Sequence, residues 1–249
     1  MRRAFAAAGK DVSIVNAAVD GQSTRGHIAV FDRWFPLIEG LKARFVLVYA
    51  GINDVAVEGH EKYDEMRSPD PARRWAEAIK NKSALYDVYK IAKGMLAAKS
   101  AHVVHGDTSR AGLDWVKWMP VDTDFAAAPS YAGRLRDYEE RLRVLAGKIR
   151  DFGARAIYVT QPAADYRIRD GWIWLPTGDS RSGAENYFRL IDGFNRVTMH
   201  VCRDVGAVCI DLARNVSFED KDLYDRVHNT DTGAAKIGRY LYSALKDVL

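Results

Sequence analysis

Residues 45–54 read FVLVYAGIND, a run of six apolar residues followed by the tetrad Gly51-Ile52-Asn53-Asp54. The run is continuous instead of alternating, and it is rich in β-branched and aromatic residues, which predicts a strand covered on both faces. Strands covered in this way belong to parallel α/β sheets, whose ligands bind beyond the carboxyl ends of the strands. The polar residues directly after the run, Asn53 and Asp54, are therefore candidates for a functional site.

Three further apolar runs predict strands of the same kind: VSIV at 12–15, AIYVT at 156–160 and AVCI at 207–210. Amphipathic segments at 27–41, 131–152, 185–205 and 232–248 lie between or after these runs. Helices that alternate with buried strands form βαβ units. The sequence therefore predicts a three-layer α/β/α sandwich with a parallel sheet.

The 249 residues predict one domain, 1–249, with two segments that break the alternation at about 55–129 and 163–183. The first has helical stretches near 72–80 and 84–98 and no strand signal. Both segments are interpreted as insertions over the carboxyl edge of the sheet. Their aromatic residues either form a lid or substrate wall, or pack the insertions onto the body. These are Trp115, Trp118, Tyr166, Trp172 and Trp174.

Composition excludes several classes of protein. The formal net charge is +4, but Lys and Arg are mixed with Asp and Glu along the chain, which favours a solvated surface over a nucleic-acid interface. No run reaches the roughly 18 apolar residues of a membrane span. Cys202 and Cys209 lack metal or redox spacing and are expected to be small buried apolar side chains. No metal and no cofactor are expected.

Three short motifs carry the candidate chemistry: NAAVDG at 16–21, GIND at 51–54 and DRVH at 225–228. Each is weak by itself. Their placement, after two predicted strands and ahead of the last predicted helix, makes the set specific. A site that combines a glycine, an asparagine and an Asp/His pair suits acyl transfer.

In this order the motifs resemble those of the SGNH/GDSL hydrolases, a family of serine esterases and lipases with a flavodoxin-like fold. The resemblance runs from about residue 12 to the C-terminus, and VTQP at 159–162 is similar to the family's fourth strand and its loop. It implies that His228 is the general base and that Asp225 orients it. It also implies that the Gly21 backbone N–H and the Asn53 side-chain amide form the oxyanion hole.

Each of these residues also has a purely structural interpretation. Asn53 can tie down its loop, Gly21 can serve a turn, and Asp225 can cap a helix or lie at the surface. His228 can be an exposed loop histidine. Asp54 is expected to make structural hydrogen bonds.

The sequence departs from the family pattern most clearly at its start. Ala18 stands where the family has the first glycine of its second motif, and no serine precedes residue 12. The family's first strand, with its Gly-Asp-Ser nucleophile, thus has no counterpart. We expect the serine upstream of Met1, and residues 1–11 as the end of a helix. The tripeptide Gly178-Asp179-Ser180 follows GWIWLPT in the second insertion and is interpreted as a coincidence.

The sequence therefore predicts a serine-type ester hydrolase that forms an acyl-enzyme, with weak or no activity until the serine is restored. The expected substrate is a small acyl ester such as an acetyl ester, with a carbohydrate as one candidate alcohol. The alternative is a catalytically inactive relative that binds a carbohydrate or another ligand. No feature indicates an oligomeric state. The sequence as it stands favours the cytoplasm, and a leader lost with the N-terminus would favour secretion or the periplasm.

Overall fold

The computed structural model describes residues 1–19, 21–56, 86, 88–89, 113–123 and 129–249. Its α-helices, in chain order, are α1 (Arg2–Ala7), α2 (Thr24–Arg33), α5 (Ala132–Asp151), α6 (Ser180–Asp204), α7 (Leu212–Asn215) and α8 (Asp231–Leu245). Its strands are β1 (Phe45–Tyr49), β2 (Trp115–Pro120), β3 (Arg155–Val159), β4 (Arg167–Arg169), β5 (Trp172–Pro176) and β6 (Val208–Ile210). Short 3₁₀ turns are η1 (Phe35–Leu37), η2 (Asn53–Ala56), η3 (Pro129–Tyr131) and η4 (Asp220–Asp222).

The central sheet is parallel and has the strand order β1-β3-β6. Tyr49 of β1 lies opposite Val159 of β3, whose neighbour on the other side is Ile210 of β6. These are the strands predicted from the apolar runs at 45–50, 156–160 and 207–210. The carboxyl ends of all three strands consequently lie at one edge of the sheet.

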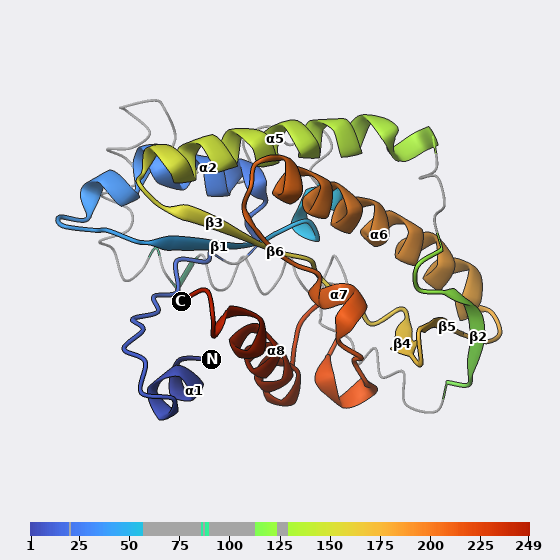
Figure 1. Ribbon diagram of the computed structural model, residues 1–249. Coiled ribbons are helices and arrows are strands. Elements are labelled where there is room, and N and C mark those ends of the chain that lie inside the picture. Colours follow the sequence, from blue (N-terminus) through green and yellow to red (C-terminus); the bar gives the residue numbers. More distant parts are fainter. Residues whose placement is uncertain (20, 57–85, 87, 90–112, 124–128) are drawn as a thin grey trace.

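Helices cover both faces of this sheet, with α2, α5 and α6 on one side and α8 and α1 on the other (Figure 1). Successive residues of β3 point to opposite faces, as the pleat of a strand requires. Ala156 and Tyr158 pack under α5 and α6, whereas Ile157 and Val159 pack against α8. The chain is therefore a three-layer α/β/α sandwich, as the sequence predicted.

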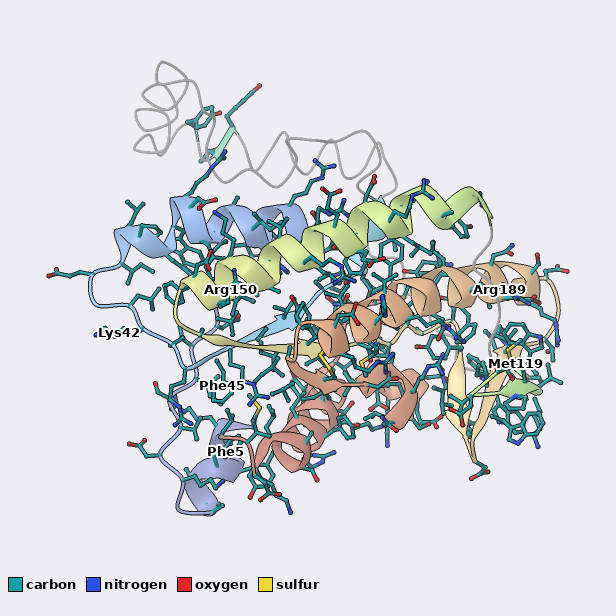
Figure 2. The ribbon with its side chains drawn as sticks, turned by 45° about the horizontal axis from the view of Figure 1, so that its top comes forward. Phe5, Lys42, Phe45, Met119, Arg150 and Arg189 are labelled. Carbon is teal, nitrogen blue, oxygen red and sulfur yellow. A yellow bond between two sulfur atoms is a disulfide. The ribbon has the colours of Figure 1, made fainter. Side chains whose placement is uncertain are left out.

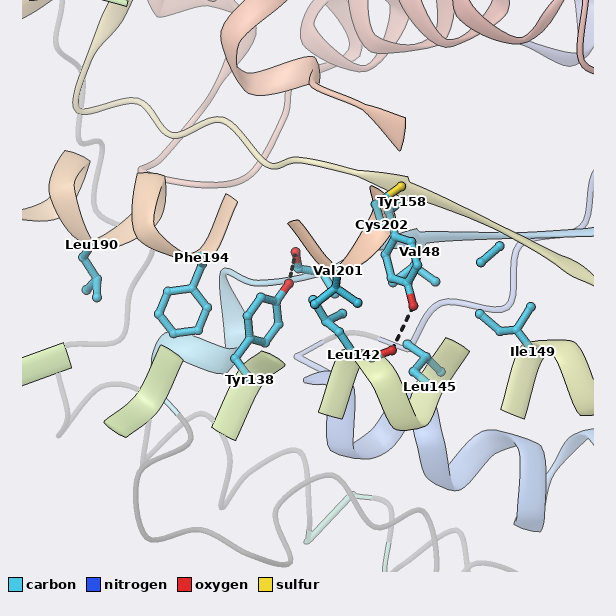
Figure 3. Packing of buried hydrophobic residues seen from close by; sticks show 12 residues of the cluster. Val48, Tyr138, Leu142, Leu145, Ile149, Tyr158, Leu190, Phe194, Val201 and Cys202 are labelled. Atoms are coloured by element: carbon cyan, nitrogen blue, oxygen red, sulfur yellow. Dashed lines mark hydrogen bonds between the residues drawn. The ribbon is translucent and has the colours of Figure 1, made fainter. Parts of the chain in front are cut away.

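Two buried tyrosines give the core between the sheet and α5 a fixed arrangement. Tyr138 donates its hydroxyl to the carbonyl oxygen of Ala50 at 3.1 Å, and Tyr158 donates to that of Leu142 at 3.0 Å (Figure 3). A buried hydroxyl without a partner would destabilise the fold, so these bonds restrict how the helix can sit on the sheet. The centroid of the Phe194 ring lies 4.8 Å from the centroid of the Tyr138 ring.

A second, antiparallel sheet has the order β2-β5-β4 and is built from the two stretches predicted as insertions. The expectation of no strand within 55–129 is wrong, because β2 lies there. It is stabilised by pairing with β5, more than fifty residues further along the chain, and such pairing is not visible in a local pattern. The helices predicted near 72–80 and 84–98 lie almost entirely outside the described residues.

The antiparallel sheet packs on the first half of α6. Ile173 and Leu175 of β5 turn toward Phe188 of α6, and the Trp118 ring meets that phenylalanine edge-on at 5.6 Å. Figure 2 shows Met119 and Arg189 at this same end of the molecule. The aromatic residues Tyr166 and Trp118 thus join the two predicted insertions to the body.

The strand predicted at 12–15 is not formed. Val15 is 79% exposed, while Val12 and Ile14 are half-buried against the cluster under α8. A strand requires a neighbour for its N–H and C=O groups. Within the part of the chain that the structure describes, β1 pairs with β3 on one side and has no strand on the other. The residues before it, at 2–7, are helical, as expected.

Cys202 at the end of α6 and Cys209 of β6 form a disulfide. The sequence predicted two small buried apolar side chains; Cys202 is buried and Cys209 partly buried, but the bond between them was not predicted. The spacing of seven residues had no recognisable pattern, but the turn from α6 into β6 brings the two Cα atoms to 5.8 Å, within bonding range. Among the described residues, no helix has both the length and the apolar character to cross a bilayer.

Candidate active site

Asp225 and His228 form a closed turn ahead of α8. The Asp225 carboxylate lies 2.6 Å from Nδ1 of His228, and its other oxygen accepts the backbone N–H groups of Val227 at 2.9 Å and His228 at 2.7 Å. An aspartate that bonds backbone groups two and three residues ahead creates a tight turn by itself. The D-x-x-H spacing thus brings carboxylate and imidazole together through local contacts.

These contacts change the acidity of Asp225. Its partial burial by itself would raise the pKa, but the hydrogen bonds from the His228 ring and from the two backbone N–H groups outweigh that effect. The pKa of Asp225 is lowered to about 2. The carboxylate therefore stays ionised at neutral pH beside Nδ1 of His228, which favours the tautomer with its proton on that nitrogen.

The turn is closed by contacts of Tyr224, and the residue that follows the turn reaches the carboxyl edge of the sheet. Tyr224 donates its N–H to the His228 carbonyl oxygen at 3.1 Å, and the two rings stack with centroids 5.5 Å apart. The side chain of the next residue, Asn229, lies beside the phenol of Tyr49, the last residue of β1. Burial raises the pKa of the Tyr49 phenol, which therefore stays neutral.

Gly21 and Asn53 also meet at this edge. Asn53 opens η2 after β1, and its Nδ2 donates to the backbone carbonyl of Gln22 at 2.9 Å. Gly21 precedes Gln22 and has φ +72°, a backbone conformation that favours glycine. The amide of Asn53 carries two hydrogens and the bond to Gln22 uses one. The structure thus brings Gly21 and Asn53 together as one pair, and Asp225 and His228 as a second.

Asp54 holds the Asn53 loop against two helices. Its buried carboxylate accepts the backbone N–H and the hydroxyl of Thr24 at the start of α2, and it forms an ion pair with Arg141 of α5 at 3.0 Å. Arg141 also donates to the Thr24 hydroxyl at 2.8 Å. Burial raises the pKa of Asp54, and the bonds from Thr24 and the charge of Arg141 oppose that rise. Asp54 therefore has the structural role expected of it.

Gln161, which follows β3, is a positioning residue that the sequence analysis missed. Its Oε1 accepts the Ile52 N–H at 2.7 Å, and its Nε2 donates to the Tyr49 carbonyl at 3.3 Å. Its own backbone exchanges two bonds of 2.9 Å with the side chain of Asn195 on α6. The glutamine in VTQP was visible in the sequence, but its partners lie more than thirty residues away.

The tripeptide Gly178-Asp179-Ser180 lies at the start of α6. Ser180 is exposed, and a surface hollow of about 470 Å³ beside it is lined by the neighbouring residues. Ser180 itself is not among the residues that line the hollow. In the ranges that the structure describes, no group of three or more His, Cys, Asp or Glu side chains is arranged to hold a metal ion.

No protein-family model matches the sequence, and no curated protein matches it. Among solved structures, the chain is similar to a catalytic mutant of Axe2, an acetylxylan esterase from Geobacillus stearothermophilus, with 15% identity and a TM-score of 0.46 over 93% of this chain and 71% of that one. It is also similar to LAE5, an α/β hydrolase from the metagenome of Lake Arreo, Spain, with 15% identity and a TM-score of 0.47 over 96% of this chain and 76% of that one. At these values neither likeness assigns a residue or an activity to this chain.

Proposed function

We propose that the protein is a serine-type ester hydrolase of the SGNH/GDSL kind, with His228 as general base and Asp225 as its orienting partner. The observation that carries the proposal is the 2.6 Å contact between the Asp225 carboxylate and Nδ1 of His228. In acyl transfer this contact fixes the ring and stabilises the imidazolium that forms. Nε2 is then the nitrogen that serves a nucleophile.

In the proposed reaction, a serine hydroxyl attacks the ester carbonyl carbon while Nε2 of His228 takes its proton. The tetrahedral intermediate collapses, and the departing alkoxide receives that proton from His228. Water then hydrolyses the acyl-enzyme by the same steps, which release the acid and restore the serine. The nucleophile is expected upstream of Met1, as the order of the sequence motifs implies.

The negative oxygen of the intermediate requires hydrogen-bond donors that are already in place. We propose the backbone N–H of Gly21 and the second amide hydrogen of Asn53 for this role. Their support is the bond between Asn53 and the Gln22 carbonyl, which joins the two segments. One such donor typically contributes about 3 kcal/mol to the stabilisation of the transition state. We propose a small acyl ester as the substrate, since the resemblance implies one.

The test is hydrolysis of short-chain p-nitrophenyl esters by the chain as printed and by the chain extended upstream in its reading frame. We expect the extended protein to be active and His228→Ala to lose at least about a thousandfold in kcat. His200→Ala is the matched control, because His200 is an exposed histidine of α6 that pairs with Asp204. An extended protein that is folded but inert, or an upstream frame without a Gly-Asp-Ser motif, contradicts the proposal.

A further inference from the structure

Three ion pairs connect the segment before and within β4 to the loop that contains Asp225 and His228. Asp165 lies 3.0 Å from Nε of Arg226, and Arg169 lies 2.7 Å from Glu219. Between them, Arg167 forms an ion pair with Asp220. Arg167 and Arg169 are two residues apart in β4, so their side chains point to the same side of the strand, toward the loop, and Asp165 lies in the turn just before it.

The pair between Asp165 and Arg226 is the one that reaches the candidate site. Arg226 lies inside the turn, directly after Asp225 and two residues before His228. Its backbone carbonyl accepts the N–H of Ala164 at 2.8 Å, so the turn is attached both through its main chain and through its side chain. Its guanidinium also lies 4.4 Å from the centre of the Tyr187 ring on α6.

Burial indicates how much this attachment contributes. The side chain of Asp165 is 4% exposed, whereas that of Arg226 is 51% exposed. A buried carboxylate depends on its cationic partner far more than an exposed one does. The Asp165 side chain therefore helps to hold Arg226 on the segment between β3 and β4, and a neutral residue at 165 would weaken this attachment.

The internal bonds of the turn do not decide where the turn sits on the body. They fix the Asp225 carboxylate relative to the His228 ring, but general-base catalysis also requires that the ring be aimed at the nucleophile. The attachment of Arg226 to the body meets this second requirement, because it holds the turn, and with it the His228 ring, in one position. Such a support for a catalytic pair is effective because a displacement of about 1 Å can lower the rate a hundredfold.

We propose that Asp165 is a positioning residue, which acts through Arg226 to hold the Asp225–His228 turn in place for catalysis. This inference rests on the proposed esterase function. It adds a residue outside the sequence motifs, and it gives the antiparallel sheet a role, because the segment that carries Asp165 continues into β4.

The test uses amide hydrogen exchange on the full chain, which requires neither substrate nor serine. In Asp165→Asn and in Arg226→Gln we expect the amide of Ala164, which donates to the Arg226 carbonyl oxygen, to exchange about tenfold faster, because local opening of the attachment becomes easier. The double variant Asp165→Asn/Arg226→Gln is expected to be no worse than the single ones, since the two residues act as a pair. Amides of β3 should be unchanged.

The matched control is Glu185→Gln, which breaks the ion pair of Glu185 with Arg189 on α6 at 2.9 Å. It should leave the turn unaffected. Unchanged exchange at Ala164, or equal acceleration throughout the molecule, would overturn the positioning role.

Measurements of kcat and KM distinguish a failure of this inference from a failure of the proposed function. If the extended protein is an esterase, Asp165→Asn should lower kcat about tenfold with little change in KM, because the loss lies in the aim of His228 and not in substrate binding. An unchanged kcat would overturn the inference even if exchange were faster. An inert wild-type protein in which Asp165→Asn still loosens the turn would instead contradict only the proposed function.

Discussion

The turn that carries Asp225 and His228 and the loop that carries Asn53 lie at the same edge of the sheet, yet their bonds differ in range. Within the turn, Asp225 bonds residues only two and three positions ahead. In the loop, Asn53 bonds Gln22, and Asp54 bonds Thr24 and Arg141, across 31, 30 and 87 positions.

This difference teaches which part of the candidate site depends on the whole fold. A local turn can form wherever its four residues are free to bend, so the acid-base pair should survive damage to distant elements. The Asn53 loop has no such independence, because its partners come from α2 and α5. Variants that break one region should therefore leave the other measurably intact.

Asp54→Ala should have the largest effect on stability. It leaves Arg141 and the Thr24 N–H without their buried partner, and breaking a buried ion pair in this way costs about 3–5 kcal/mol. Urea unfolding measures the loss. Asp32→Ala is the control, because Asp32 pairs with Lys148 at the surface and should contribute at most about 1 kcal/mol. Equal losses in the two variants would contradict a buried network at Asp54.

Gly233→Ala should disturb the turn from the other side. Gly233 lies in the first turn of α8, where an added Cβ would collide with the backbone oxygen of Asp222. The loop ahead of Asp225 must then shift, at a cost of about 1–3 kcal/mol. Gly183→Ala in α6, where a Cβ meets nothing, should instead stabilise the protein by about 0.5–1 kcal/mol. Similar unfolding midpoints for both variants would argue against the close contact.

Part of the pH dependence of stability should come from the turn. Because the pKa of folded Asp225, about 2, is below its ordinary value of 3.8, its stabilising effect is complete above pH 3.8 and is lost as the pH falls toward 2. The difference corresponds to about 1–2 kcal/mol. Asp225→Asn should remove this part of the acid dependence in urea unfolding at pH 5 and pH 2.5. Asp137→Asn, at an exposed aspartate, is the control and should not remove it. A wild-type dependence of stability on pH in Asp225→Asn would refute the local turn.

The sequence predicted β1, β3 and β6 of the parallel sheet from their continuous apolar runs. The run at 12–15 has the same composition, but it has no neighbouring strand among the described residues, and composition cannot reveal a missing partner. Strand β2 was missed for the opposite reason, because its partner β5 lies more than fifty residues further along the chain.

The candidate site likewise has a part that the sequence could predict and a part that it could not. The contact between Asp225 and His228 follows from their spacing and could be predicted, whereas the attachments made by Gln161 and Asp165 could not. Their partners, Ile52 and Arg226, come from other strands and loops. The catalytic roles of Gly21, Asn53, Asp225 and His228 stay predictions, since their contacts fit catalysis without demonstrating it.

Covalent labelling with a fluorophosphonate tests the central claim most directly, because the reagent reacts only with a serine that a general base activates. In the chain extended upstream in its reading frame, we predict one labelled serine in a peptide before residue 12, and loss of that label in His228→Ala but not in His200→Ala. Labelling that persists without His228, or a folded protein that takes up no label, would contradict the assignment of Asp225 and His228 as the acid-base pair of an ester hydrolase.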